Sequence, residues 1–174
     1  TQAQAIIDGN SGDADPAVVS LLGELHRLAR AIEQRRQKAG MLHLDLPDVE
    51  LVFDENHKVV DAVPEDTSYT HTMIEMFMVE ANEVVARLFE DLNVPLLRRI
   101  HPDPVPGDVE GMRKVAMVAG FRVPKNPTRE ELQGLLKATH GTPAARAVHL
   151  AVLRTLSKAE YSPAAIGHFA LASE

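Results

Sequence analysis

The strongest constraint on the fold is a long periodic run of apolar residues in the middle of the chain, from Thr67 to Leu92. The spacing of three and four residues places one apolar stripe on one helix face, formed by Met73, Phe77, Ala81, Val84 and Leu88. Further apolar residues lie off this stripe, and a helix that is apolar on most sides is usually central. The run therefore predicts a central helix that buries the stripe, with Asp66 or Thr67 as its N-cap.

Shorter patterns on both sides of this run predict a helix-rich, single-domain α+β fold with a small antiparallel sheet. Proline at a first helical position, a capping-box pattern at Thr128 and helix-ending glycines predict helices over residues 1–9, 16–39, 108–119 and 128–138, and another from residue 142. Short apolar or alternating runs between residues 41 and 63 predict two or three antiparallel strands, with Pro47 between the first and the second. A further short strand is expected over residues 96–100.

The composition excludes several classes of site. The chain has no cysteine, which rules out disulfides and thiolate metal sites and is consistent with a cytoplasmic protein. We find no apolar run near the length of about 20 residues that a membrane helix needs, and no signal peptide pattern. The net charge of −7 argues against a surface that holds nucleic acid by bulk charge. The eight histidines lack paired zinc spacing and the acids form no tight Asp cluster, so we expect no metal site.

Two segments resemble the ribonuclease II / ribonuclease R family of exoribonucleases. The run THTMIEMFMVEANEVVARLF is similar to the family's H-R-L-I-E-E-F-M-L-L-A-N-E-x-V-A, with Thr72 in place of Arg and Met76 in place of a second Glu. The closing run LRTLSKAEYSPAAIGHFALASE is similar to L-R-S-M-K-Q-A-x-Y-S-P-E-N-x-G-H-F-G-L-A. A third stretch, LLRRIHP, resembles L-Y-R-V-H-x-x-P. The order of these segments along the chain agrees with the family.

The resemblance implies an enzyme that hydrolyses single-stranded RNA processively, from 3′ to 5′, to nucleoside monophosphates with the help of Mg²⁺. The family's Asp-rich metal motif and its catalytic Arg motif have no counterpart among these residues. We therefore expect residues 1–174 to be a partial RNB-type catalytic domain that supplies scaffold and part of the RNA channel. No catalytic residue is expected within the chain, and the chain alone is expected to bind no metal and to be inactive.

Five residues are candidates for contacts with RNA on the strength of this resemblance. Glu75 matches a glutamate that contacts the sugar of the terminal nucleotide, and a carboxylate can accept a hydrogen bond from the ribose 2′-OH that DNA lacks. The others are Asn82, which is expected to organise its helix, Arg99 and His101, which could contact phosphates together with Arg98, and His168. For two aromatic residues we expect burial: Tyr161 as an anchor and Phe169 as part of the core.

Other interpretations remain open at this stage. The chain could be a non-catalytic α+β interaction module or RNA-binding module that keeps this part of the fold. A weaker alternative is an unrelated small hydrolase that uses Glu75 with His71, one helical turn apart. The basic residues at 98–101 could also lie in a solvated loop with a salt bridge to a nearby acid.

Overall fold

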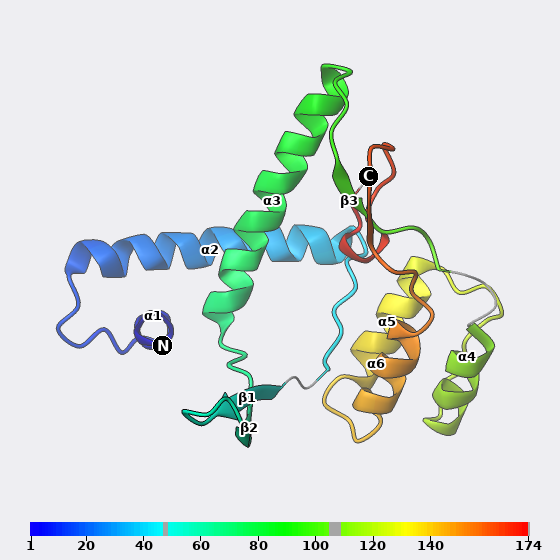
Figure 1. Cartoon of the computed structure of the whole chain (residues 1–174), viewed down its shortest axis with the longest axis horizontal. Coiled ribbons are helices and arrows are strands. Elements are labelled where there is room, and N and C mark those ends of the chain that lie inside the picture. Colours follow the sequence, from blue (N-terminus) through cyan, green and yellow to red (C-terminus); the bar gives the residue numbers. More distant parts are fainter. Residues whose placement is uncertain (47–48, 105–108, 174) are drawn as a thin grey trace. The chain divides into compact units, whose positions relative to one another are not determined.

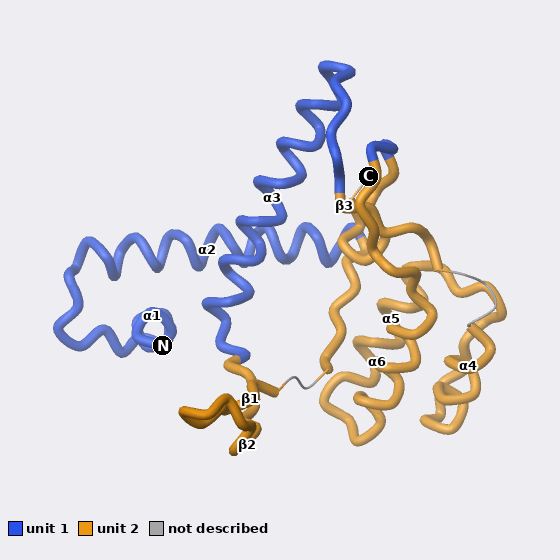
Figure 2. Tube along the Cα trace, viewed as in Figure 1, with its two compact units in different colours: residues 1–39, 67–98, 163–165 blue, residues 40–66, 99–162, 166–174 orange. Residues whose placement is uncertain are grey.

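The computed structural model describes residues 1–46, 49–104 and 109–173, and it divides into two units. Figure 2 colours unit 1, residues 1–39, 67–98 and 163–165, apart from unit 2, residues 40–66, 99–162 and 166–174. Its helices and two small sheets confirm a helix-rich α+β fold with a small antiparallel sheet. Pro47 and Asp108 lie outside the described residues. Among the described residues, no helix is long and apolar enough to span a membrane.

Unit 1 is built from three helices: α1 (Gln2–Ile7), α2 (Pro16–Lys38) and α3 (Tyr69–Asp91). The two long helices, α2 and α3, cross each other, as Figure 1 shows. The backbone N–H of Ala17 donates to the side chain of Asp15 at 2.7 Å, and Pro16 follows at the first helical position, so α2 begins as expected.

The start of α3 differs from the prediction. Its N-cap is Ser68, which makes no side-chain capping bond, rather than Asp66 or Thr67. The N–H of Thr70 instead donates to the side-chain oxygen of Gln4, on α1, at 3.1 Å. A free N–H of the first turn can be satisfied by any nearby acceptor, and here a partner from another helix takes the place of a local cap.

The prediction that α3 buries a continuous apolar stripe is wrong. Met73 is buried, but Phe77 is only half-buried, Ala81 is exposed, and 62% of Val84 and 52% of Leu88 is accessible to solvent. The other fully buried apolar residue of α3 is Met76, which lies off the predicted stripe. Farther along the helix, the side that meets α2 carries Glu80 and Glu83 rather than apolar residues. Periodicity identified the helix correctly but not the side of it that packs.

Ion pairs connect the two long helices of unit 1. Arg36 of α2 has only 4% of its side chain exposed, and it donates to both Glu80 and Glu83 of α3. Arg35 also pairs with Glu80, but 63% of its side chain is exposed. The basic last turn of α2 therefore has two effects. Its cations interact favourably with the negative end of the α2 helix dipole, and two of them form ion pairs that attach α2 to α3.

Unit 2 contains an antiparallel hairpin of β1 (Val49–Phe53) and β2 (Val59–Pro64), with Val49 opposite Pro64 and Leu51 opposite Ala62. The carboxylate of Asp54 accepts hydrogen bonds from the N–H groups of Asn56 and Lys58 at 2.8 and 2.9 Å, which fixes the turn. Every residue of both strands is exposed. The predicted strand at 41–46 is absent: these residues form no regular element, although Met41 and Leu42 are buried.

The core of unit 2 lies among three helices, α4 (Val109–Val118), α5 (Arg129–Thr139) and α6 (Ala145–Leu153), shown in Figure 1. The predicted capping box is present: the N–H of Glu131 donates to the Thr128 hydroxyl and the N–H of Thr128 donates to the Glu131 carboxylate. The buried cluster consists of Leu42, Val109, Met112, Ala116, Leu132, Leu135, Leu136, Val148, Val152 and Phe169. The expected core position of Phe169 is confirmed.

The remaining elements of unit 2 are short. Strand β3 (Arg98–Ile100), which begins at the last residue of unit 1, pairs with β4 (Glu160–Ser162), and a 3₁₀ turn, η2 (Phe169–Leu171), follows. The sequence predicted β3 but neither β4 nor η2.

Candidate nucleic-acid interface

Three of the five candidate residues come together in unit 2. His101 directly follows β3, His168 directly precedes η2, and the two residues form a bridge with parallel pairing. Their imidazole rings lie edge to face with centroids 4.8 Å apart. Arg99, on β3, is close enough to His168 to influence its protonation. Backbone pairing between distant segments therefore assembles a small cluster of nitrogen-bearing side chains.

The buried side chain of His101 is fully engaged in hydrogen bonds. Its Nδ1 accepts from the N–H of Ala170 at 3.3 Å, so the proton resides on Nε2, which donates to the carbonyl of Ser157 at 2.7 Å. Its backbone N–H donates to Gly167, and its carbonyl accepts from Phe169. This neutral imidazole connects β3 to the segment before β4 and to η2, so it can position its neighbours but has no free nitrogen for a ligand.

His168 is half-buried, and its environment disfavours the charged form. Burial is the largest cause, and the neighbouring His101 and Arg99 add to it, so that the pKa of His168 is lowered from 6.5 to about 4. Its Nδ1 accepts from the N–H of Leu171 at 3.4 Å. At neutral pH this side chain is an uncharged hydrogen-bonding group and adds no positive charge to the cluster.

Arg99 is the cation of this cluster that faces solvent. Its guanidinium carbon lies 5.4 Å from the ring centroid of Tyr161, on β4. The expectation that Tyr161 is a buried anchor is wrong, because 66% of this residue is exposed. Its strand has three residues, and two of them are exposed, so too little chain packs over the ring to cover it. The alternating residues around Glu160 were the available sequence signal for this strand.

Arg98 behaves differently from Arg99. Its guanidinium pairs with Glu90 at 3.3 Å and donates to the carbonyl of Ala86, both in α3. The sequence left open a salt bridge between the basic residues at 98–101 and a nearby acid, and Arg98 forms such a bridge. Arg98 is thus occupied within unit 1, whereas Arg99 is available.

The other two candidates, Glu75 and Asn82, belong to α3 in unit 1. Both are exposed and they lie two helical turns apart, on nearly the same side of the helix. His71, one turn before Glu75, is exposed as well. The surface position of Glu75 leaves its carboxylate accessible to a ligand.

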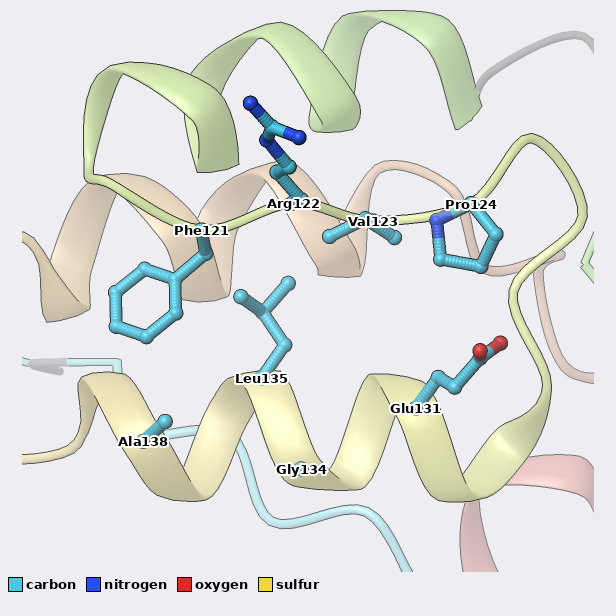
Figure 3. Close-up of a pocket in the computed structure, with 8 residues that line it drawn as sticks. All are labelled: Phe121, Arg122, Val123, Pro124, Glu131, Gly134, Leu135 and Ala138. Carbon is cyan, nitrogen blue, oxygen red and sulfur yellow. The ribbon is translucent and has the colours of Figure 1, made fainter.

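A hollow of about 190 Å³ in unit 2 lies between α5 and the segment that follows α4 (Figure 3). Phe121, Val123 and Leu135 line it, while Arg122 points away from α5. The carboxylate of Glu131 is used by the helix cap. Because Glu131 is used by the cap and Arg122 points away from α5, neither charged residue of the lining is directed into this hollow, which therefore does not have the character of a binding site.

Comparison with known proteins identifies the family of this chain. A family model described as the RNB domain matches residues 1–174. This chain belongs to the RNB domain family. It is 32% identical to ribonuclease R of Aquifex aeolicus over 161 residues, 91% of this chain and 23% of the relative. It is 33% identical to ribonuclease R of Thermotoga maritima over 143 residues, 81% of this chain and 20% of the relative.

Solved structures of a ribonuclease R share this fold. The structure of Mycoplasma genitalium RNase R in complex with ribose-methylated single-stranded RNA matches with a TM-score of 0.89 and 26% identity, covering 99% of this chain and 28% of that chain. The apo form of the same protein also matches with a TM-score of 0.89. This RNB chain therefore spans about a quarter of the length of the relatives it matches.

The described residues of this RNB chain also bear on metal binding. Mg²⁺ in proteins takes several oxygen ligands, mostly from carboxylates. Across residues 1–46, 49–104 and 109–173 no three His, Asp or Glu side chains converge so that they could hold a metal ion. The described residues do not fit a Mg²⁺ site, so no chemical step at a metal can be assigned to them.

Proposed function

We propose that this chain is part of the catalytic domain of a cytoplasmic 3′-to-5′ exoribonuclease that hydrolyses single-stranded RNA processively to nucleoside monophosphates. The observation that carries the proposal is the RNB family match over residues 1–174 together with the similarity to ribonuclease R. The related Mycoplasma genitalium RNase R was solved with single-stranded RNA. In this proposal the chain supplies scaffold and part of the RNA channel, whereas the Mg²⁺-dependent hydrolytic centre belongs to the whole enzyme and has no residue in this chain.

Each candidate residue has a role in this proposal that its environment supports. Arg99 contacts an RNA phosphate, because this residue is exposed and no acid among the described residues pairs with it. His101 positions β3 and η2 through its two ring nitrogens. His168 offers a neutral imidazole at the same place.

On α3, Glu75 accepts a hydrogen bond from a ribose 2′-OH, and Asn82 orders the same helix surface two turns later. Because Glu75 is exposed, its carboxylate is accessible to such a ligand. The proposal therefore separates function from stability at this residue.

The experiment that tests this proposal is Glu75→Ala in the complete enzyme. A hydrogen bond to a charged acceptor contributes about 1.5–3 kcal/mol, so its loss should relax the preference for RNA over DNA by about 10- to 150-fold. Because Glu75 is exposed, the melting temperature should stay within about 1 °C, as for other surface substitutions.

Two controls accompany this variant. Glu75→Gln keeps an acceptor oxygen and should lose less discrimination, and Asp91→Asn, at the exposed end of the same helix, should lose none. If Glu75→Ala lowers the melting temperature while the ratio of RNA to DNA cleavage stays fixed, Glu75 is structural and has no contact with the sugar.

The alternative is a non-catalytic α+β interaction or RNA-binding module. It predicts that the complete protein binds single-stranded RNA without shortening it. The family match favours the enzyme, because the relatives that share this sequence are ribonucleases by name.

A further inference from the structure

We propose that Tyr161 and Arg99 together hold one nucleotide of single-stranded RNA: the base stacks on the exposed tyrosine ring while the guanidinium contacts the adjacent phosphate. This inference rests on the proposed function and adds a residue, Tyr161, that neither the sequence motifs nor the family match assigned to RNA. Proteins that bind single strands combine cations along the backbone with aromatic rings on which bases stack. Neighbouring strands of one small sheet present both groups here.

The first support is the contrast between the two tyrosines of the chain. Tyr69 has its ring covered by the guanidinium of Arg30 at 3.6 Å and faces the imidazole of His26 at 5.1 Å, and its hydroxyl donates to Glu33 at 3.1 Å. Tyr161 has none of this cover: Arg99 at 5.4 Å is its one aromatic or cationic neighbour among the described residues. An aromatic ring left this open can accept a planar ligand.

The second support is the state of the neighbouring cation. No acidic side chain in the described parts of the chain lies within ion-pair distance of Arg99, whereas the adjacent Arg98 pairs with Glu90. Glu160, next to Tyr161 on β4, projects to the opposite side because side chains alternate along a strand. Arg99 therefore keeps its charge available beside the ring.

The third support is consistency with the acidity of the chain. A net charge of −7 disfavours binding through many phosphate contacts. A site with one cation and one aromatic ring requires only that these two groups match a phosphate and a base, because stacking of a base on the ring depends little on the net charge of the chain. The neutral state of His168 above pH 4 means that Arg99 supplies the charge of this cluster.

The competing explanation is a surface cation–π pair that only joins β3 to β4. The sequence makes the two explanations separable by spectroscopy, since the chain has no tryptophan and only two tyrosines. With Tyr69→Phe as background, the fluorescence of Tyr161 can be followed alone. We expect a single-stranded oligouridylate to quench it, and an abasic ribose-phosphate oligomer of equal length to leave it unchanged.

Affinity measurements on the 174-residue chain complete the test, using a 3′-fluorescein-labelled oligouridylate at low salt. Tyr161→Ala should weaken binding by about 5- to 150-fold, the range for loss of one stacked base. Tyr161→Phe should retain the wild-type affinity. Arg99→Ala should reduce the slope of log affinity against log salt by about 0.7, the value for one phosphate contact on a single strand, and Arg98→Ala should leave that slope unchanged.

Three results would overturn the inference: equal quenching by the abasic oligomer, unchanged affinity in a folded Tyr161→Ala variant, or no binding by the chain at all. The first two leave the proposed function intact, and the third removes only the phosphate contact proposed for Arg99, because the proposed function itself depends on RNA hydrolysis and sugar discrimination by the complete enzyme. Conversely, a complete enzyme that does not degrade RNA would refute the proposed function even if Tyr161 stacks on bases.

Discussion

At the scale of the residue, His168 should make the stability of the chain depend on pH. Its pKa is about 4 in the folded state against 6.5 for an exposed histidine. Between these values the unfolded chain takes up a proton that the folded chain does not, so the free energy of unfolding falls as the pH drops from 6.5 to 4 and is unaffected by this group above 6.5. Urea unfolding at pH 7 and at pH 5 measures this loss.

The matched variant for this prediction is His168→Asn, whose side-chain oxygen can still accept from the N–H of Leu171. It removes the titrating group and should lose less stability than the wild type between the two pH values. Equal losses in the two proteins would show that the imidazole of His168 is not the group responsible.

The same scale shows what sequence patterns can and cannot predict. The two motifs that contain His101 and His168 marked these residues as candidates, because the residue types within each motif and their spacing are local properties. Their mutual contact, and the exposure of Tyr161 beside Arg99, depend on pairing between segments far apart in the chain. Periodicity carries no information about such pairing.

At the scale of the element, the packing of α2 on α3 should depend on Arg36 far more than on Arg35. Arg36 is buried and pairs with Glu80 and Glu83, so Arg36→Ala leaves these partly buried carboxylates without their main cation and should cost about 3–5 kcal/mol. Arg35 shares Glu80 but is exposed, and its loss should cost about 0–1 kcal/mol. Denaturant unfolding of both variants measures the difference, and equal effects would contradict the buried ion-pair network.

The packing surface of α3 gives a second test at this scale. Met76 is 1% exposed, and Met76→Ala should cost about 2–5 kcal/mol, the usual penalty for truncating a buried side chain. Val84→Ala should change the free energy of unfolding by at most about 0.5 kcal/mol, because Val84 is mostly exposed. Thermal and urea unfolding compare the two, and a larger cost at Val84 would restore the stripe predicted from the sequence.

Element boundaries were predictable wherever a local signal fixes them. Asp15-Pro16 begins α2 and the Thr128–Glu131 capping box begins α5, as expected. The start of α3 was not predictable in detail, because its first-turn N–H is satisfied by Gln4 of α1. The packed side of α3 was misassigned for a related reason: its second half meets α2 through charges, which an apolar pattern does not detect.

At the scale of the whole molecule, the family could be predicted from the sequence but the division into two units could not. The two long motifs suffice for the family because each combines several specific residue types in order, and the RNB match over residues 1–174 confirms it. The units alternate along the chain, with segments of unit 1 before and after the first part of unit 2. No linker of distinctive composition marks that alternation in the sequence.

The most direct test of the central claim follows the fate of 5′-labelled single-stranded RNA with Mg²⁺, incubated with the complete enzyme and, in parallel, with the 174-residue chain. The complete enzyme is predicted to shorten the RNA stepwise from its 3′ end and to release nucleoside monophosphates. The chain alone is predicted to leave the RNA intact, since its described residues hold no group of acids able to bind the metal. Internal cleavage or no cleavage by the complete enzyme would contradict the exoribonuclease assignment, and stepwise shortening that copurifies with the isolated chain would contradict the placement of hydrolysis elsewhere.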